Sequence, residues 1–324
     1  MVRPLALLLA LTGCGPGEPL AWITTTALPD GRVALDYQVA LEASAETTTG
    51  AAWFLEDGAL PPGVALDEAG TLAGLPTTSG DYAFTLRLED GEDEDWADLS
   101  IHVPPVCLMS GYEPFGGYPT NPSIEALWPL DEVLVAGLDV RVVELPVVWD
   151  VAWDVLYDEI VALDPSVVIS TGQAGNDAMR FETVAKNRES GTDNDGVSRS
   201  GEPVVEGGPE TLADRLPEAE MTAAMEAAGY HTTVSSDAGS YLCNFIFYRL
   251  MYHVEYESQR DLVAGFIHVS PASAGYDYAV EDITAAHTIG LEALSTWMAA
   301  GAALSPPLPA TVHGAPDYLG SVRP

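Results

Sequence analysis

The sequence contains few cysteines. Only Cys14, Cys107 and Cys243 occur in 324 residues, and they lack the paired spacing of a zinc site. Three cysteines also exclude a disulfide-rich scaffold. Cys107 lies in the apolar run 106–109, so we expect a buried core residue there, although a bridge to Cys243 stays open. The cysteine spacing thus predicts no metal centre, and we expect no cofactor.

Basic residues are also scarce. Lysine and arginine together number 12 against 49 aspartates and glutamates, so the formal net charge is -37. Such a charge repels nucleic acids and anionic lipid headgroups, and we expect neither as a partner. Hydrophobic residues make up 47% of the chain, which is enough for one or two packed cores.

The first residues resemble a bacterial lipoprotein signal peptide. Residues 1–13 contain one basic residue, an apolar core over residues 5–11, and Leu-Thr-Gly directly before Cys14. The resemblance implies cleavage before Cys14, lipid attachment at that residue, a tether over residues 14–19, and a place in the cell envelope. An ordinary secretory signal stays open as an alternative. The apolar core is too short for a permanent transmembrane helix, and no later apolar run is long enough.

Residues 20–103 show the pattern of a small β-sandwich, in which short alternating apolar runs are separated by Gly, Pro and Asp clusters. The runs cover residues 33–39, 82–88 and 99–103. Residues 58–91 contain Leu-Pro-Pro-Gly, Gly-Thr-Leu-Ala-Gly-Leu-Pro and a final Asp-Gly, and they resemble the immunoglobulin-like and cadherin-like repeats of bacterial surface proteins. Such modules serve as spacers or weak binders. The acidic run 89–95 could hold calcium, but we prefer a solvated hairpin turn.

After Pro104 and Pro105 the pattern changes to alternating strands and helices over residues 106–301. The predicted strands are 107–110, 140–147, 166–171, 232–236 and 262–269. The predicted helices are 149–163, 219–229, 245–252, 280–298, and a short one that Asn121 caps and Pro122 begins. This alternation predicts a three-layer α/β/α domain with a mainly parallel sheet. Residues 302–324, rich in Pro, Ala and Gly, are predicted to be a loose tail.

Two reactive side chains fall at the ends of predicted elements. Polar and glycine residues lead into Cys243, and the apolar run 245–252 follows at helical spacing. A thiol at a helix N-terminus is expected to have a lowered pKa. The strand 262–269 carries His268 near its end, and an imidazole beside such a thiol can act as its base. Structural roles stay open, because free cysteines and single histidines are usually structural.

Five sequence blocks occur in a fixed order along residues 106–300. They read SGYEPFGGYPTNPS (110–123), TGQAGNDAMRFETVAKN (171–187), DNDG with EPVVEGGPETLADRLP (193–217), DAGSYLCN (237–244) and AGFIHVS (264–270). Together they resemble the pyroglutamyl peptidase type I family, also called pyrrolidone-carboxylate peptidases. The resemblance implies a cysteine peptidase that removes N-terminal pyroglutamate from peptides through an acyl-enzyme. It also implies no cofactor, and a homo-oligomer as one expected state.

Carried over by position, the resemblance makes Cys243 the nucleophile and His268 the general base and then acid, while Glu182 orients the imidazole. A neutral lactam needs apolar walls and a few aligned hydrogen bonds. By resemblance, the substrate-binding residues are Tyr112, Phe115, Gln173, Tyr241 and Leu242. Where the family usually has phenylalanine, Tyr112 adds a hydroxyl that needs a partner.

Two segments depart from the family pattern. Asn176 and Asp177 stand where the family usually has Gly-Arg, and the spacing to Glu182 is one residue shorter. Residues 190–192 stand where family members carry Arg-Ile-Pro, and Arg180 or Arg188 is a candidate to replace that arginine. The alternatives are a related small-acyl amide hydrolase with altered specificity and a catalytically silent, lipid-anchored binding protein.

Overall fold

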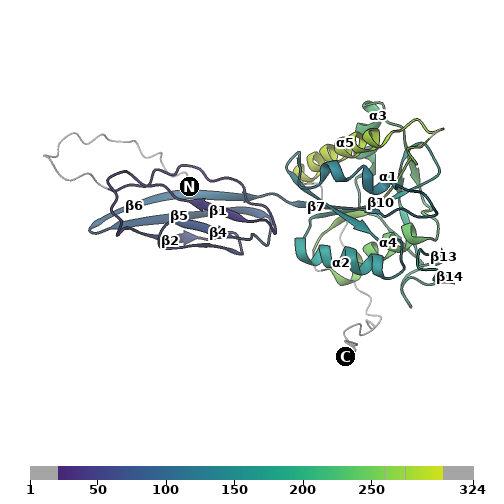
Figure 1. Cartoon of the computed structure of the whole chain (residues 1–324), viewed down its shortest axis with the longest axis horizontal. Coiled ribbons are helices and arrows are strands. Elements are labelled where there is room, and N and C mark those ends of the chain that lie inside the picture. Colours follow the sequence, from purple (N-terminus) through teal and green to yellow (C-terminus); the bar gives the residue numbers. More distant parts are fainter. Residues whose placement is uncertain (1–20, 259, 274, 302–324) are drawn as a thin grey trace. The chain divides into compact units, whose positions relative to one another are not determined.

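The computed structural model describes residues 21–258, 260–273 and 275–301, which form two compact units (Figure 1). Most of the second unit is the chain from Val103 onward, and the short segments Arg32–Ala34 and Thr77–Gly80 are assigned to it as well. The predicted signal peptide (1–13), lipidation site Cys14, tether (14–19) and tail (302–324) lie outside the described residues. No helix in the described part of the chain is long and apolar enough to cross a membrane.

The first unit contains two three-stranded sheets. One has the order β1 (Tyr37–Ala40), β4 (Thr71–Gly74), β3 (Val64–Leu66), and the other β2 (Ala52–Gly58), β5 (Gly80–Asp90), β6 (Asp93–Val103). Trp53, Leu72 and Leu86 are buried in its core. The antiparallel unit and a hairpin turn within residues 89–95 match the prediction. The predicted strand 33–39 is wrong in its first half, because Ala34 has a positive φ of 58° in a turn.

The second unit is built on a seven-stranded sheet with the order β16-β11-β17-β10-β7-β9-β8. Its strands are β7 (Val106–Tyr112), β8 (Leu134–Val135), β9 (Leu138–Leu145), β10 (Val167–Gln173), β11 (Met179–Glu182), β16 (Thr232–Ser235) and β17 (Val263–Val269). Neighbouring strands are parallel except for β11 with β17 and β8 with β9. Two small antiparallel sheets pair β12 (Val184–Lys186) with β15 (Thr211–Ala213) and β13 (Glu189–Thr192) with β14 (Ser198–Glu202), and the second of them is a hairpin.

Helices cover both faces of this sheet, which confirms the three-layer prediction (Figure 1). One face carries α1 (Pro122–Glu125), α3 (Glu218–Ala227) and α5 (Val280–Ala299), and the other carries α2 (Val151–Leu163) and α4 (Leu242–Tyr252). Two short segments, η1 (Trp128–Leu130) and η2 (His253–Glu257), are a 3-10 and a π-helix. An apolar core on one side of the sheet includes Met109, Ile169, Phe181, Ile267 and Leu291.

Several predicted boundaries shift in the structure, for local reasons. The predicted strand 140–147 ends at Leu145, because Pro146 cannot donate a ladder hydrogen bond. The predicted helix 149–163 begins only at Val151, since Asp150 has a positive φ of 60°. Asn121 caps α1 as predicted, and its side chain accepts a hydrogen bond from the Ser123 N–H. The sequence did not predict β8 or β11 to β15, whose strands have two to five residues.

Candidate active site

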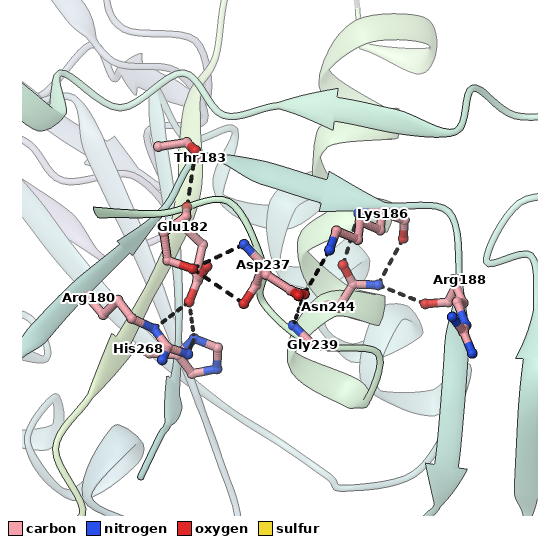
Figure 2. A network of polar contacts seen from close by, with 10 residues as sticks. Arg180, Glu182, Thr183, Lys186, Arg188, Asp237, Gly239, Asn244 and His268 are labelled. Atoms are coloured by element: carbon pink, nitrogen blue, oxygen red, sulfur yellow. Dashed lines mark hydrogen bonds and ion pairs between the residues drawn. The ribbon is translucent and has the colours of Figure 1, made fainter. Parts of the chain in front are cut away.

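An imidazole and a carboxylate form a buried pair on two adjacent strands. His268, near the end of β17, is 4% exposed, and Glu182, at the end of β11, is fully buried. The Nδ1 atom of His268 lies 2.7 Å from Oε1 of Glu182 (Figure 2). An ionised carboxylate can only accept, so Nδ1 carries the proton and donates it to this bond. The second ring nitrogen, Nε2, is left as the basic one.

The sheet register explains why these side chains meet. In the antiparallel pairing of β11 with β17, Arg180 lies opposite His268 and Glu182 lies opposite Phe266. Side chains alternate between the faces of a strand, so all four project toward the face that α4 covers. Phe181 and Ile267 project to the other face and belong to the apolar core.

The charges of the pair are set by opposing influences. Burial raises the pKa of Glu182, but the hydrogen bond from His268, the nearby Ser235 side chain and the charges of His268 and Arg180 outweigh it, so the pKa lies below its ordinary value. Burial also lowers the pKa of His268, and its hydrogen bond to Glu182 offsets only part of this effect. At neutral pH the resting pair is therefore a carboxylate and a neutral imidazole.

The thiol of Cys243 reaches the same place from the helix layer. Cys243 is a partly exposed, free cysteine in the first turn of α4, directly after Leu242. Gly172 on β10 is the register partner of His268, and a Cβ atom built at Gly172 would lie 2.7 Å from the sulfur of Cys243. The sulfur thus packs against the glycine backbone beside the strand that carries His268. The structure therefore brings all three predicted catalytic residues to one place.

The sequence did not identify Gly172 as a site residue. Gly172 is the first residue of the Gly-Gln-Ala-Gly sequence, which was the available signal. Glycine is needed there because a side chain would occupy the space into which the Cys243 sulfur packs. This role depends on a close approach between β10 and α4, which no local pattern in the sequence reveals.

The electrostatic environment of the thiol differs from the prediction. Desolvation, and secondarily the negative charge of Glu182, raise the pKa of Cys243 to about 12. Its own backbone N–H and the charge of Arg180 act in the opposite direction but are weaker. The expected lowering of the thiol pKa by the helix N-terminus is therefore wrong for the resting site. A base must remove the proton before the sulfur can attack.

A small cavity opens beside the sulfur. It encloses about 250 Å³, including its opening to solvent. Its lining residues are Tyr112, Phe115, Asn121, Val147, Gln173, Tyr241, Leu242 and Cys243. All five predicted substrate-binding residues are among them, and the sequence missed Asn121 and Val147. The lining is mainly apolar and aromatic, which suits a small, neutral ligand.

Hydrogen bonds hold the walls of this cavity in place. The Tyr112 hydroxyl donates to the Leu242 carbonyl at 2.7 Å, so the expected partner exists. The Tyr241 hydroxyl donates to the Thr192 carbonyl at 2.8 Å, and the Trp149 ring packs edge-on against Tyr241. These contacts fix the orientation of both aromatic side chains.

Asn244, directly after the thiol, connects α4 to the segment that follows Glu182. Its amide nitrogen donates to the carbonyls of Lys186 and Arg188, both at 2.8 Å, and its Oδ1 accepts from the Lys186 N–H at 2.9 Å (Figure 2). Asn244 is fully buried. It therefore ties the helix that carries Cys243 to the segment that follows Glu182, a contact that the sequence did not reveal.

The two candidate arginines lie in different surroundings. The side chain of Arg180 contacts the buried pair, with Nε 2.7 Å from Oε1 of Glu182. Arg188 is exposed. Among the described residues, no group of histidines, cysteines and acids could hold a metal ion.

A thiol in the first turn of a helix and an imidazole–carboxylate pair on two adjacent strands, beside a small cavity, are the groups of a cysteine-type hydrolase built on an α/β fold. A family model described as pyroglutamyl peptidase matches residues 106–294, and a second one, for an Ig domain, matches residues 21–103. The chain therefore belongs to the pyroglutamyl peptidase family and is a cysteine peptidase.

Individual relatives agree with this assignment. The pyrrolidone-carboxylate peptidase of Cupriavidus necator is 38% identical over 167 residues, which is 51% of this chain and 77% of that protein. Its counterpart in Erwinia tasmaniensis is 37% identical over 165 residues, or 50% and 76%. The crystal structure of pyroglutamyl peptidase I from Bacillus amyloliquefaciens matches with a TM-score of 0.57 and 27% identity, covering 59% of this chain and 97% of that chain.

Proposed function

We propose that this protein removes N-terminal pyroglutamate from peptides, with Cys243 as nucleophile, His268 as general base and acid, and Glu182 as the carboxylate that orients the imidazole. The observation that carries the proposal is the small aromatic cavity that opens onto the sulfur, next to the buried His268–Glu182 pair. Cavity and reactive groups thus share one residue, Cys243.

In the first half-reaction, Nε2 of His268 takes the proton of the Cys243 thiol, and the sulfur attacks the carbonyl carbon of the pyroglutamyl peptide bond. The resulting imidazolium is stabilised by the Glu182 carboxylate, which also holds Nδ1 in the donor tautomer. When the tetrahedral intermediate collapses, His268 returns the proton to the leaving amine. A thioester with the pyroglutamyl group remains on Cys243.

In the second half-reaction, water attacks the thioester carbonyl, and His268 takes one of its protons. Collapse of this intermediate expels the sulfur, which regains a proton from His268, and free pyroglutamate leaves. The oxyanion of each intermediate lies near the first turn of α4, where backbone N–H groups have no partner within the helix. The N–H of Cys243 is the proposed donor.

A fluorogenic pyroglutamyl amide tests the proposal directly. We expect thiol-dependent turnover by the wild type and none by Cys243→Ala, with Cys107→Ala as a matched control that keeps its activity. Cleavage that survives in Cys243→Ala would contradict the assigned nucleophile. A wild type that is inert toward this amide but cleaves other small N-acyl amides would contradict the substrate.

One observation favours a related amide hydrolase as the second candidate. The segment that departs from the family pattern, residues 190–192, contacts the cavity wall. A Cβ atom at Gly191 would lie 2.5 Å from the Tyr241 ring, and Thr192 accepts the Tyr241 hydrogen bond. A changed segment behind a wall can alter the shape of the cavity. Relative kcat/KM values for pyroglutamyl, prolyl and acetyl amides separate the two candidates.

We also propose that lipid on Cys14 anchors the protein in the bacterial cell envelope, on the support of residues 1–14 alone. Metabolic labelling with a radioactive fatty acid should mark the wild type and leave Cys14→Ala unlabelled; labelling of both would contradict the proposal. A homo-oligomer also stays a prediction, and light scattering of the delipidated protein tests it.

A further inference from the structure

Arg180 reaches the buried pair from the side. It stands directly opposite His268 in the pairing of β11 with β17, and two residues before Glu182 on the same strand. Its Nε donates to Oε1 of Glu182 at 2.7 Å, and its Nη2 lies 3.2 Å from Nδ1 of His268 (Figure 2). One carboxylate oxygen therefore accepts from both the guanidinium and the imidazole.

The position of the guanidinium has electrostatic consequences for all three reactive groups. Its positive charge lowers the pKa of Glu182, of His268 and of Cys243. It therefore favours the carboxylate and the thiolate and disfavours the imidazolium. The Arg180 side chain is 26% exposed whereas that of Glu182 is fully buried, so the charge lies at the edge of the site and costs less desolvation than a fully buried one.

The other charged groups nearby are engaged elsewhere. Lys186 pairs with Asp237 at 2.9 Å, and both side chains are substantially exposed. The positive charge of Arg180 also contributes to lowering the pKa of Asp237. From β17, the Phe266 ring packs edge-on against His268 with centroids 4.9 Å apart and brings no charge. From β7, the hydroxyl of Tyr112 stays protonated, because burial raises its pKa well above 10.

We propose that Arg180 is a positioning residue of this active site: it holds the Glu182 carboxylate against His268 and keeps the imidazole in its neutral, proton-accepting form. The roles of Glu182 and His268 in this inference rest on the proposed function. Arginine suits the position because its planar guanidinium donates through Nε to Glu182 while its delocalised charge also lies beside the His268 ring, whereas a lysine would supply charge from a single point.

The test uses full-length Arg180→Gln and Arg180→Lys, with Arg260→Gln as a control that removes a surface charge paired with Asp164. The first readout is the rate of iodoacetamide alkylation at Cys243 against pH, followed by mass spectrometry, which needs no substrate. The second is kcat and KM for the pyroglutamyl amide against pH. Circular dichroism establishes that each variant is folded.

For Arg180→Gln we expect the acid limb of kcat/KM and the alkylation profile both to move to higher pH, because the pKa values of His268 and Cys243 rise when the positive charge is lost. We expect kcat to fall about tenfold, in the range of one lost positioning contact, with KM within about twofold. Arg180→Lys should keep both profiles near their wild-type positions and recover part of kcat. Arg260→Gln should match the wild type.

Superimposable profiles for wild type and Arg180→Gln would overturn the inference. If Arg180→Gln does not fold, Arg180→Lys decides: profiles in place with reduced kcat support the role, and unchanged kcat and profiles overturn it. A wild type that does not cleave the amide, while the alkylation profile still shifts in Arg180→Gln, would contradict the proposed function and support the effect of Arg180 on the thiol.

Discussion

The two free cysteines of the second unit occupy environments that differ in one decisive respect. Cys107, on β7, is fully buried in the apolar core, and Cys243, on α4, borders a cavity. Desolvation raises the pKa of both thiols above the ordinary range. A low thiol pKa therefore does not distinguish Cys243 from Cys107. What distinguishes Cys243 is access to a small cavity and an imidazole–carboxylate pair close by.

Replacing each cysteine by alanine gives the largest contrast. In Cys243→Ala we expect the rate of pyroglutamyl amide cleavage to fall by at least about 10³-fold, because the covalent route is lost. Cys107→Ala should keep the wild-type kcat/KM. Initial rates at matched concentrations of folded protein measure both. Equal losses in the two variants would mean that access to the cavity does not distinguish the thiols.

Removing the negative charge next to His268 should have the next largest effect. Glu182→Gln keeps the shape of the side chain, and we expect kcat to fall about 10²- to 10⁴-fold, as when a triad carboxylate is neutralised. In the wild type the acid limb of the kcat/KM profile should lie below pH 6.5, the ordinary pKa of histidine, because the pKa of His268 is lowered. The Glu182 charge raises the pKa of His268, so the acid limb should move to still lower pH in Glu182→Gln.

This downward shift is opposite to the one expected for Arg180→Gln. The pH dependence of kcat/KM for the wild type and both variants, measured in one buffer series, checks the signs. Movement of the limb in the same direction in both variants would show that the two charges do not act on His268 as described.

The packing of Cys243 against Gly172 offers a finer test. In Gly172→Ala the new methyl group would meet the sulfur at 2.7 Å and the Phe266 ring at 3.0 Å, so the thiol must move. We expect kcat to fall about tenfold or more, the scale of a misplaced reacting atom. Gly175→Ala, three residues later, is the matched control, because nothing lies within 4 Å of its Cβ position and its φ is not positive.

For Cys107 the expected effect is on stability alone. Cys107→Ala leaves a small void in the core, and we expect the free energy of unfolding to fall by about 1–2 kcal/mol. Urea denaturation followed by tryptophan fluorescence measures the change. A loss of activity without a loss of stability would show that Cys107 has a catalytic function.

The smallest effect is expected at the wall of the cavity. Tyr112→Phe removes the hydroxyl that donates to the Leu242 carbonyl and restores the usual residue of the family. Loss of one neutral hydrogen bond is worth about 1 kcal/mol, so kcat/KM should change less than about tenfold. A complete loss of turnover would mean that this hydroxyl takes part in the chemistry.

The sequence was most informative where a local pattern determines the structure. The apolar run after Cys243 correctly predicted α4, and the β-branched run before His268 correctly predicted β17. The Asn121–Pro122 pair correctly predicted the start of α1. The role of Glu182 was inferred from the ordered family blocks. Its place on a strand was not, because β11 has only four residues and lies between polar loops.

The remaining features depend on contacts between distant segments. The neighbour of Gly172 is Cys243, 71 positions later, and the neighbour of Arg180 is His268. The thiol pKa was wrongly predicted for the same reason, because the helix N-terminus is visible in the sequence whereas the desolvation and the Glu182 charge come from other elements. Local sequence patterns predicted the helices and strands, whereas the pKa values of the site depend on contacts between segments that are far apart in the sequence.

The register of β11 sets a limit on how this site can vary. Met179 and Phe181 face the core while Arg180 and Glu182 face the site, and pairing with both β16 and β17 holds that assignment. Residues 176–178 precede the strand, so changes of length there need not reach the catalytic groups. Deleting one residue inside β11 would instead exchange the two faces, exposing Phe181 to the site and forcing a charge into the core. Natural and designed variants should therefore tolerate insertions before Met179 and none between Met179 and Glu182.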